Sequence, residues 1–247
     1  MPKKPTHLDK RLRTMKTFFS LLALLLYLPA LYAQNDRTTA ASEEMDYHLG
    51  FRVAPRVSTL GGGIEVAKGL SPRFGLRGGF NYFSYQYDAT EDDVAYDLEL
   101  ELKSFGVFAD YHPFKGSFRI SGGLLLNGNG LSGKAKPSGS FDIGDKTYTA
   151  AEINSINLDV SYNSLAPYLG LGWDTTFGDD EHWGFTFDVG LIYSGAAGVT
   201  LGVNHNLTGA TASDLETQRQ KEQNDLQDEL NNLEWWPVLS AGIVYQF

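Results

Sequence analysis

Four histidines beyond residue 34 are the side chains best suited to acid–base catalysis near neutral pH. They are His48, His112, His182 and His205. A catalytic site would place such a histidine beside a serine or a carboxylate on one face of an element. None of the four has a partner of this kind at strand spacing, and the chain contains no cysteine that could act as nucleophile or zinc ligand. We therefore expect no enzymatic activity, no cofactor and no metal site.

Charged residues at alternate positions of apolar segments offer a different chemistry, the pairing or selection of ions. If the apolar positions face outward, the interior receives five basic and seven acidic residues: Arg52, Arg56, Glu65, Arg77, Glu99, Glu101, Lys103, Asp110, Arg119, Asp159, Asp174 and Asp188. Enclosed charges must be paired or hydrated, because an isolated buried charge is very costly. Two interpretations stay open: an interior filled by salt bridges, and a constriction that prefers cations.

The constriction hypothesis singles out Glu99 and Glu101, which we expect to face Arg77 and Arg119 on the two neighbouring strands. The full set of candidates for the lumen is Arg77, Glu99, Glu101, Lys103, Arg119, Asp159 and Asp188. Their acidic excess would concentrate cationic solutes by electrostatic attraction.

The elements that must position these side chains are strands. Apolar residues alternate with small or polar residues through most of residues 48–203, most clearly from Trp183 to Tyr193. This period of two is typical of strands with two different faces. Strands of soluble proteins usually contain about 5 or 6 residues, and segments such as 183–203 are far longer. Long strands with one apolar, aromatic-rich face indicate a transmembrane β-barrel.

Eight antiparallel strands are predicted, at residues 48–57, 62–69, 74–87, 96–111, 117–135, 157–176, 183–203 and 235–247. Short turns at 69–73, 112–116 and 178–182 alternate with longer polar loops at 88–95, 137–155 and 204–234. An even strand number and this alternation are typical of outer-membrane barrels. The phase of the apolar positions changes near Ser104 and near Asn163 and Ser164, which we interpret as β-bulges.

The last long loop contains a predicted helix, residues 213–233. Ser213 to Glu216 fits the capping box S-x-x-E, and Leu226, Leu230 and Leu233 follow at spacings of four and three. We expect about four or five helical turns that order a long connection. A lid or a partner-binding surface is the alternative for this helix.

The start of the chain differs in charge from the rest. Residues 1–33 contain six basic residues and one acidic residue, although the formal net charge of all 247 residues is −10. A basic stretch, an apolar run at 18–28 and the small residue Ala33 predict a secretory signal peptide, with Met1 or Met15 as its first residue. The run is too short for a spanning helix of about 20 residues.

We therefore expect a cleaved signal peptide at 1–33, a periplasmic segment at 34–47 and a barrel at 48–247. The part after the signal is strongly acidic, at about −15. Because nucleic-acid binding requires a basic patch, we expect no nucleic-acid partner.

Aromatic residues stand near the ends of several predicted strands, where membrane-interface girdles are expected. They are Trp173, Trp183, Tyr193, Trp235, Tyr245 and Phe247. The terminal Tyr-x-Phe sequence resembles the signal that the barrel-assembly machinery reads in bacterial outer-membrane proteins. We expect a Gram-negative outer-membrane location, with membrane lipid, lipopolysaccharide and, through Phe247, that machinery as partners.

Three short motifs stand out, at residues 165–172, at Trp183-Gly184-Phe185 and at Asp188-Val189-Gly190. An acidic helical loop then leads into residues 234–238. Together these segments resemble the carbapenem-associated ornithine-uptake porin (CarO-like) family of small eight-stranded outer-membrane proteins. Members are credited with passage of basic amino acids, so the resemblance implies a narrow solute channel.

The sequence thus predicts a narrow passive channel for small solutes, cationic ones in particular. The alternative is a non-conducting structural or adhesive barrel with a salt-bridged lumen, because side chains just fill an eight-stranded barrel. A lipid-modifying barrel enzyme is the third class, and the histidines argue against it.

Overall fold

The computed structural model describes residues 49–91, 94–231 and 233–247. The predicted signal peptide (1–33), the predicted periplasmic segment (34–47) and His48 lie outside the described residues. No helix in the described ranges is both long enough and apolar enough to cross a bilayer.

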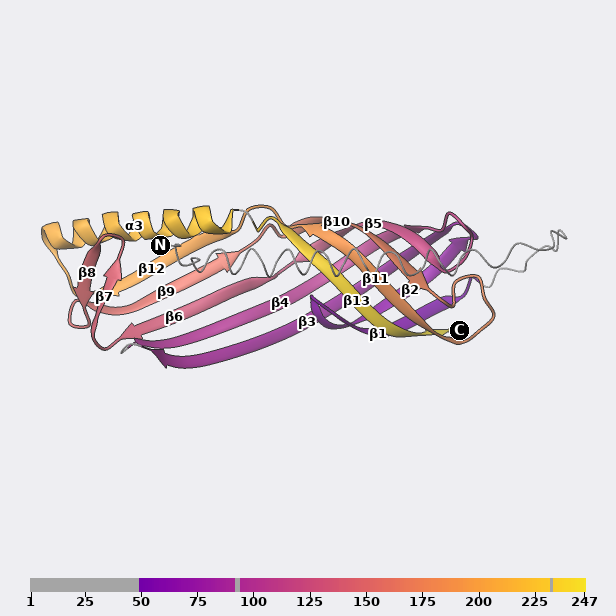
Figure 1. The fold of residues 1–247 in the computed structure, drawn as a ribbon, viewed down its shortest axis with the longest axis horizontal. Helices are drawn as coiled ribbons and strands as arrows, with labels where there is room; N and C mark the ends of the chain where they lie inside the picture. The colour runs from indigo at the N-terminus through magenta and orange to yellow at the C-terminus, as the bar shows by residue number, and fades with distance from the viewer. Residues whose placement is uncertain (1–48, 92–93, 232) are drawn as a thin grey trace, which may run out of the picture. The chain divides into compact units, whose positions relative to one another are not determined.

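Eight antiparallel strands close into a barrel, as predicted (Figure 1). Each strand pairs with the next in the ring, and closure occurs because β4 pairs with β5 as well as with β3. In ring order the strands are β1 (Phe51–Ser58), β2 (Gly61–Ser71), β3 (Phe74–Glu91), β4 (Val94–Tyr111), β5 (Phe118–Asn127), β10 (Leu165–Asp174), β11 (Trp183–Tyr193) and β13 (Trp235–Gln246).

One side of the barrel wall continues beyond the ring as a five-stranded sheet, which we call the extension. It consists of residues 84–91 of β3 and 94–101 of β4, followed by β6 (Gly130–Pro137), β9 (Ile153–Ser161) and β12 (Gly198–His205). The remaining elements are the hairpin β7 (Ser140–Ile143) and β8 (Lys146–Thr149), and helix α3 (Gly209–Leu230). We call the barrel end that carries the extension the loop end, and the opposite end the turn end.

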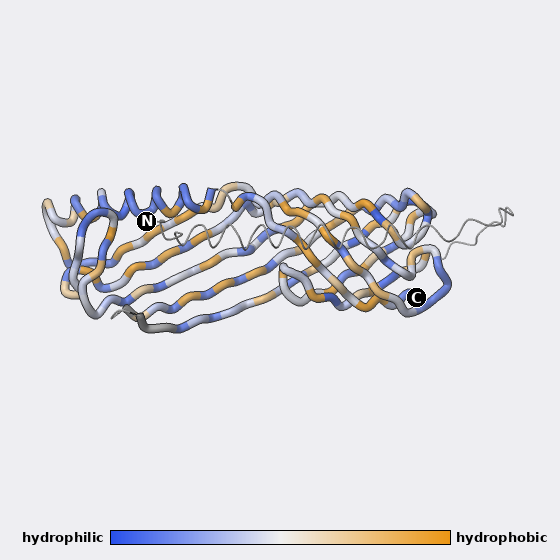
Figure 2. Tube along the Cα trace, in the orientation of Figure 1, coloured by the Kyte–Doolittle hydropathy of each residue, from blue (hydrophilic) through white to orange (hydrophobic). Residues whose placement is uncertain are grey.

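The two predicted bulges are wrong, and the structure gives a different reason for the change of phase. β3 and β4 pair without interruption from Phe74 opposite Tyr111 to Glu91 opposite Val94, so no residue is inserted near Ser104. On the turn-end side of Ser104, β4 turns Phe105, Val107 and Tyr111 outward, with Phe108 as the inward exception; on the loop-end side, β4 turns its leucines to the inner face. Figure 2 shows this alternation of polar and apolar positions along the strands.

The inversion follows from the surroundings of the two parts. A barrel wall in a membrane places apolar side chains outside and polar ones inside. The extension instead has a polar outer face and an apolar inner face, the ordinary arrangement of a half-solvated sheet. The apolar residues of the same alternating pattern therefore face outward in the barrel and inward in the extension. The second predicted bulge, between β9 and β10, has the same explanation, because Leu158 and Val160 of the extension face inward, whereas Leu165 and Leu169 of the barrel face outward.

Between β11 and β12 the alternation of inner and outer positions does shift by one residue, and a glycine allows this shift. Tyr193 lies on the outer side, whereas Val199 and Leu201 are buried on the inner side opposite Val160 and Leu158. Gly195 lies between them with φ of +69°, in the left-handed region that favours glycine. The predicted single strand 183–203 is thus two strands separated by a turn.

Two loop predictions also change. The predicted long loop 88–95 is mostly strand, because β3 and β4 extend to Glu91 and Val94. Helix α3 begins at Gly209, four residues before the predicted cap, and the Ser213 hydroxyl donates to the Gly209 carbonyl inside the helix (3.4 Å). The capping-box prediction is therefore wrong, although a helix in this loop is confirmed.

Candidate functional site

The lumen near the turn end is filled by an ionic layer of four arginines and four carboxylates. Its members are Arg52, Arg56, Arg77, Arg119, Glu65, Asp110, Asp174 and Asp188, all of them buried. They come from β1, β2, β3, β4, β5, β10 and β11, at the inward-facing positions of those strands. The arginine and carboxylate charges balance, so the layer is formally neutral.

Arg77 is the centre of this layer. Its guanidinium donates to Asp110 (2.6 Å) and Glu65 (2.8 Å), and it lies 3.4 Å from Asp188. It also donates to the Ser121 hydroxyl (3.0 Å), which in turn donates to Asp110 (2.6 Å). Arginine suits this position because its planar group offers five donors in a fixed geometry.

The other three arginines complete the network. Arg119 pairs with Asp188 (2.9 Å) and lies 3.5 Å from Asp174, while Arg52 donates to Asp174 (2.5 Å). Arg56 pairs with Glu65. Because removal of one partner would leave buried charge uncompensated, the layer holds the strands together from within.

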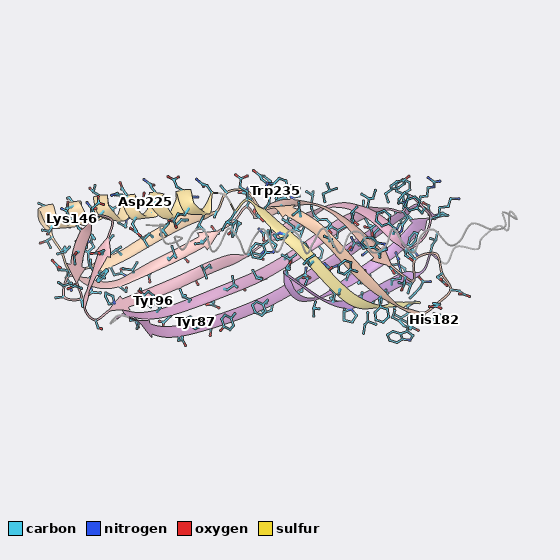
Figure 3. The ribbon with its side chains drawn as sticks, in the orientation of Figure 1. Tyr87, Tyr96, Lys146, His182, Asp225 and Trp235 are labelled. Carbon is cyan, nitrogen blue, oxygen red and sulfur yellow. The ribbon has the colours of Figure 1, made fainter. Side chains whose placement is uncertain are left out.

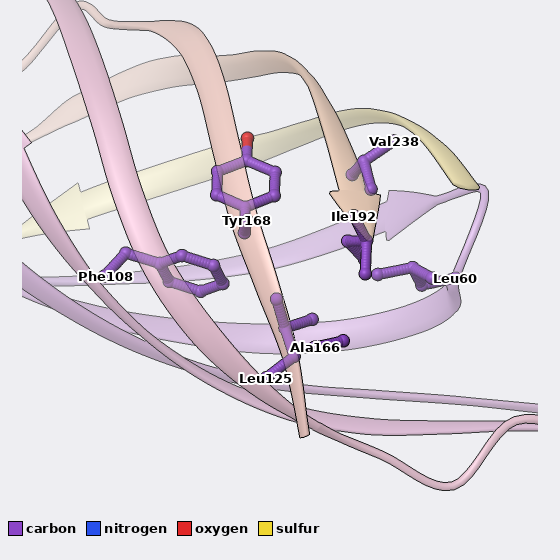
Figure 4. Packing of buried hydrophobic residues seen from close by; sticks show 7 residues of the cluster. All are labelled: Leu60, Phe108, Leu125, Ala166, Tyr168, Ile192 and Val238. Carbon is purple, nitrogen blue, oxygen red and sulfur yellow. The ribbon is translucent and has the colours of Figure 1, made fainter. Parts of the chain in front are cut away.

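An apolar layer lies on the loop-end side of the ionic one. Figure 4 shows its seven buried residues from close by. Its buried members are Leu60, Phe108, Leu125, Ala166, Tyr168, Ile192 and Val238, with Trp236 packed against them. Phe108 and Tyr168 meet edge to face with ring centroids 5.0 Å apart. Leu60 belongs to the short β1–β2 turn, which places its side chain inside the barrel rather than in solvent.

A small cavity of about 10 Å³ separates the two layers. Its lining includes Arg56, Arg77 and Asp188 on one side and Leu60, Phe108 and Tyr168 on the other. A space of this size holds about one water molecule. At this level the lumen is therefore closed by packed side chains.

The predicted candidates for the lumen divide into two groups. Arg77, Arg119 and Asp188 lie inside the lumen, as members of the ionic layer. Glu99, Glu101, Lys103 and Asp159 do not: they are exposed on the outer face, in or beside the extension. The expected pairing of Glu99 and Glu101 with Arg77 and Arg119 is wrong, because it depended on a bulge that the strand does not contain.

Sequence reasoning missed the apolar layer. Phe108, Leu125 and Tyr168 lie at inner positions of the barrel whose nearest inner neighbours on the same strand are polar or small, so they broke the expected pattern. That departure was the available signal. Leu60 gave none, because a single leucine in a tight turn is ordinary.

The predicted interface aromatics form clusters at both ends of the barrel. At the turn end, Trp183 contacts Tyr245 (ring centroids 4.8 Å apart), Tyr245 contacts Phe247 (4.9 Å), and Trp173 contacts Phe118 (5.2 Å). At the loop end, Tyr193 contacts Trp235 (4.9 Å). Figure 3 shows Trp235 and His182 at these opposite ends. These contacts place aromatic rings at both ends of the apolar outer wall, the positions expected of membrane-interface aromatics.

Helix α3 covers the β12 edge of the extension. The Gln227 and Gln223 side chains accept hydrogen bonds from the backbone N–H groups of Val199 and Leu201 (3.1 Å each). Arg219 donates to the Leu201 carbonyl (2.8 Å). Four helical residues rise about 6 Å and two strand residues about 6.8 Å, so side chains four apart on α3 match alternate residues of β12. The helix thus replaces a neighbouring strand.

The same helix binds the β7–β8 hairpin. Lys146 pairs with Asp214 (2.6 Å), and this hydrogen bond raises the pKa of Lys146. Leu215 is buried against Ile143 and Tyr148 of the hairpin. On α3 itself, the hydrogen bonds from Arg219 lower the pKa of Glu216 to about 2.

Two histidines at the turn end contact backbone carbonyl groups. His112 is buried, stacked on Phe177 and bonded through Nδ1 to the Gly116 carbonyl (2.7 Å). His182 makes a similar contact with the Gln246 carbonyl (3.0 Å). The described residues contain no group of three or more histidines and carboxylates that could hold a metal ion.

Comparison with known proteins supports the fold. No protein-family model and no curated protein sequence matches the chain. The structure is similar to the crystal structure of Acinetobacter baumannii CarO2, with a TM-score of 0.51 and 23% identity over 81% of this chain and 99% of that one. Similarity to A. baumannii CarO (TM-score 0.49, 22% identity, 83% and 100% covered) and to a major outer membrane protein from Thermus thermophilus (0.37, 13%, 81% and 100%) is weaker. The resemblance inferred from the sequence is confirmed at the level of the fold.

Proposed function

We propose that this protein is an outer-membrane barrel whose lumen does not form a permanently open pore, so that the protein functions through its loop end. The observation that carries the proposal is the pair of stacked layers in the lumen. The ionic layer balances its charges internally, and the apolar layer above it excludes water. To pass, a hydrated ion would have to disrupt both layers, and the free-energy cost would include leaving buried charges of the ionic layer unpaired.

The orientation we propose places the turn end in the periplasm and the loop end outside the cell. Both described chain ends, at Leu49 and Phe247, lie at the turn end, since Phe51 and Arg52 neighbour Phe247 and Gln246. Short periplasmic turns and longer extracellular loops are typical of such barrels. Export through the signal peptide, assembly through Phe247 and contact with lipopolysaccharide around the outer girdle remain part of this proposal.

The cation-selective channel becomes the second candidate. Its original basis was an acidic excess in the lumen, but the lumen is neutral and the excess lies on the outer face, at Glu99, Glu101 and Asp159. Those carboxylates would raise the local concentration of cationic solutes without selecting them inside the barrel. Passage of basic amino acids would then require the two layers to rearrange.

Conductance and liposome swelling test this proposal together. We expect no steady conductance from the purified protein in planar bilayers and no swelling with lysine, ornithine or glucose. Correct insertion is checked by the shift in gel mobility between folded and heated barrel. The double variant Phe108→Ala/Arg77→Ser, selected as folded by the same mobility shift, should leak because it opens both layers. Steady single-channel steps or lysine-dependent swelling of the wild type would overturn the proposal in favour of a channel.

A further inference from the structure

The inner face of the extension is an apolar surface that the rest of the protein covers only on one side. Helix α3 packs Leu226 and Leu230 against the β12 and β9 side. On the β3 and β4 side, Tyr85 and Tyr87 remain 55% and 48% exposed, far more than the members of the apolar layer. Figure 3 shows Tyr87 and Tyr96 on the two long strands, well away from the barrel.

A hollow of about 540 Å³ is set into this face, between the sheet and the β7–β8 hairpin. Its lining includes Tyr96, Leu98, Ala135, Phe141, Ile156 and Leu158. Pockets for small molecules usually measure about 300–1,000 Å³ and are mostly apolar, with a few polar groups. The hollow thus has the size and composition of a small-molecule site.

Charge indicates which molecules would fit. The inner positions of residues 85–88, 95–100, 130–137, 156–160 and 199–203 carry tyrosine, aliphatic residues, glycine and Pro137, and no charged side chain. Two charged residues border the hollow: Lys134 is an exposed outer position of β6, and Asp142 of the hairpin already accepts a hydrogen bond from Thr147 (2.7 Å). Since an unpaired charge is costly against an apolar wall, the occupant should be uncharged.

A second copy of the chain does not fit this face. Two copies in one membrane share an orientation, so a twofold axis relating them runs along the membrane normal. The inner face stands above the mouth of its own barrel, because β3 and β4 continue the barrel wall without a break in register. Bringing two inner faces together about that axis would force the two barrels into each other.

Membrane lipid does not reach the hollow either. Phe105 is the last lipid-facing aromatic residue of β4, and charged residues occupy the outer positions from Lys103 to Asp97. Leu98 lies seven residues from Phe105 along the strand, about 23 Å at strand spacing. With a tilt of about 45°, that places the hollow about 16 Å beyond the apolar band. An occupant therefore arrives from the aqueous side.

We propose that this hollow is a binding site for an uncharged, largely apolar small molecule taken from the medium, with flat rings or short hydrocarbon chains that pack against Tyr96, Phe141 and Leu158. The two exposed tyrosines beside it, Tyr85 and Tyr87, extend the same surface toward the barrel mouth. This inference does not depend on whether the lumen conducts, since the hollow lies wholly outside the barrel.

Fluorescence of 1-N-phenylnaphthylamine, an uncharged aromatic probe, tests the site in the full-length protein reconstituted in lipid nanodiscs. We expect saturable binding above that of protein-free nanodiscs. Tyr96→Ala and Phe141→Ala should each weaken it by about 10-fold, because each removes one ring from the lining. The anionic probe 8-anilinonaphthalene-1-sulfonate should bind far more weakly.

The matched control is Glu99→Ala, also a truncation to alanine, three residues from Tyr96 on the same strand but on the opposite face. It should bind the probe as the wild type does. Leu158→Met, which retains bulk and apolarity, should also bind and shows that loss in the alanine variants is not general disruption. No saturable signal in the wild type, equal binding in Tyr96→Ala and Phe141→Ala, or equal loss in Glu99→Ala would each overturn the proposal.

Discussion

The barrel and the extension share two continuous strands yet bury opposite kinds of side chain. Inside the barrel, β3 and β4 contribute Arg77 and Asp110 to an ionic layer. Beyond the mouth, the same faces of the same strands carry Tyr85 and Leu100, while the charged residues Glu99 and Glu101 lie outside. The comparison shows that the surroundings of the wall, and not its backbone, decide which face is polar.

The two regions also differ in how they complete their hydrogen bonds. The barrel closes on itself, so each of its strands has two neighbours and no edge remains. The extension has two edges, at β12 and along residues 84–91 of β3, and α3 covers the β12 edge with glutamine and arginine side chains. The barrel should therefore resist the loss of any single polar contact outside its ionic layer, whereas the extension depends on a few side chains of one helix.

The largest expected effect is in the ionic layer. Arg77→Met should destabilise the barrel by about 3–5 kcal/mol, because Glu65, Asp110 and Asp188 would lose a shared partner in a buried site. Arg73→Met, on the exposed turn just before β3, is the matched control and should change little. The measurement is the shift in the urea midpoint of unfolding in lipid vesicles. Equal midpoints for the two variants would show that the network is not what stabilises the barrel.

A smaller loss is expected in the apolar layer. Phe108→Ala removes a buried ring that contacts Tyr168 and should cost about 3–4 kcal/mol. Phe105→Ala, three residues away on the lipid-facing side, should cost clearly less because lipid fills the space that the ring leaves. Unfolding midpoints in vesicles compare the pair. If Phe105→Ala proved the more harmful, the assignment of inner and outer faces of β4 would be wrong.

The edge of the extension should respond locally. Gln223→Ala combined with Gln227→Ala removes two acceptors from the β12 backbone, each worth about 1 kcal/mol. Hydrogen exchange of the Val199 and Leu201 amides should become faster by about 10-fold, with the barrel amides unchanged. Gln220→Ala serves as control, since Gln220 bonds to Glu216 on the helix surface. Unchanged exchange at Val199 and Leu201 would mean that α3 does not cap this edge.

The smallest expected effect on stability comes from single cysteine substitutions on β4. Labelling of these cysteines shows directly which residues of β4 face outward in the barrel and in the extension. The chain has no cysteine, so each introduced thiol is the sole target for a membrane-impermeant maleimide. Glu99→Cys and Glu101→Cys should be labelled on intact cells, and Val107→Cys should be protected by lipid. Stability should change by less than about 0.5 kcal/mol for the first two. Protection of Glu99→Cys would restore the prediction that this residue lies in the lumen.

Much of the fold could be predicted from the residues. The eight strands were placed because period two persists over long segments, and Arg77, Arg119 and Asp188 were assigned to the lumen because they alternate with lipid-facing residues. Glu99, Glu101 and Asp159 obey the same local rule but lie beyond the closed barrel, in the extension, where the rule reverses. A pattern of alternation fixes which residues share a face, but not which medium that face meets.

The sequence by itself determined the strand periodicity, the even strand count and the aromatic residues at the strand ends, because each depends on local spacing and on the chemistry of an apolar outer wall. Only the tertiary structure decided where the closed barrel ends along β3 and β4. That level is set by how far the neighbouring strands β13, β1 and β2 extend beside them. It also decided that four arginines meet four carboxylates across the lumen, since those pairs come from strands distant in the chain. The closed lumen and the open apolar hollow above it both follow from that arrangement.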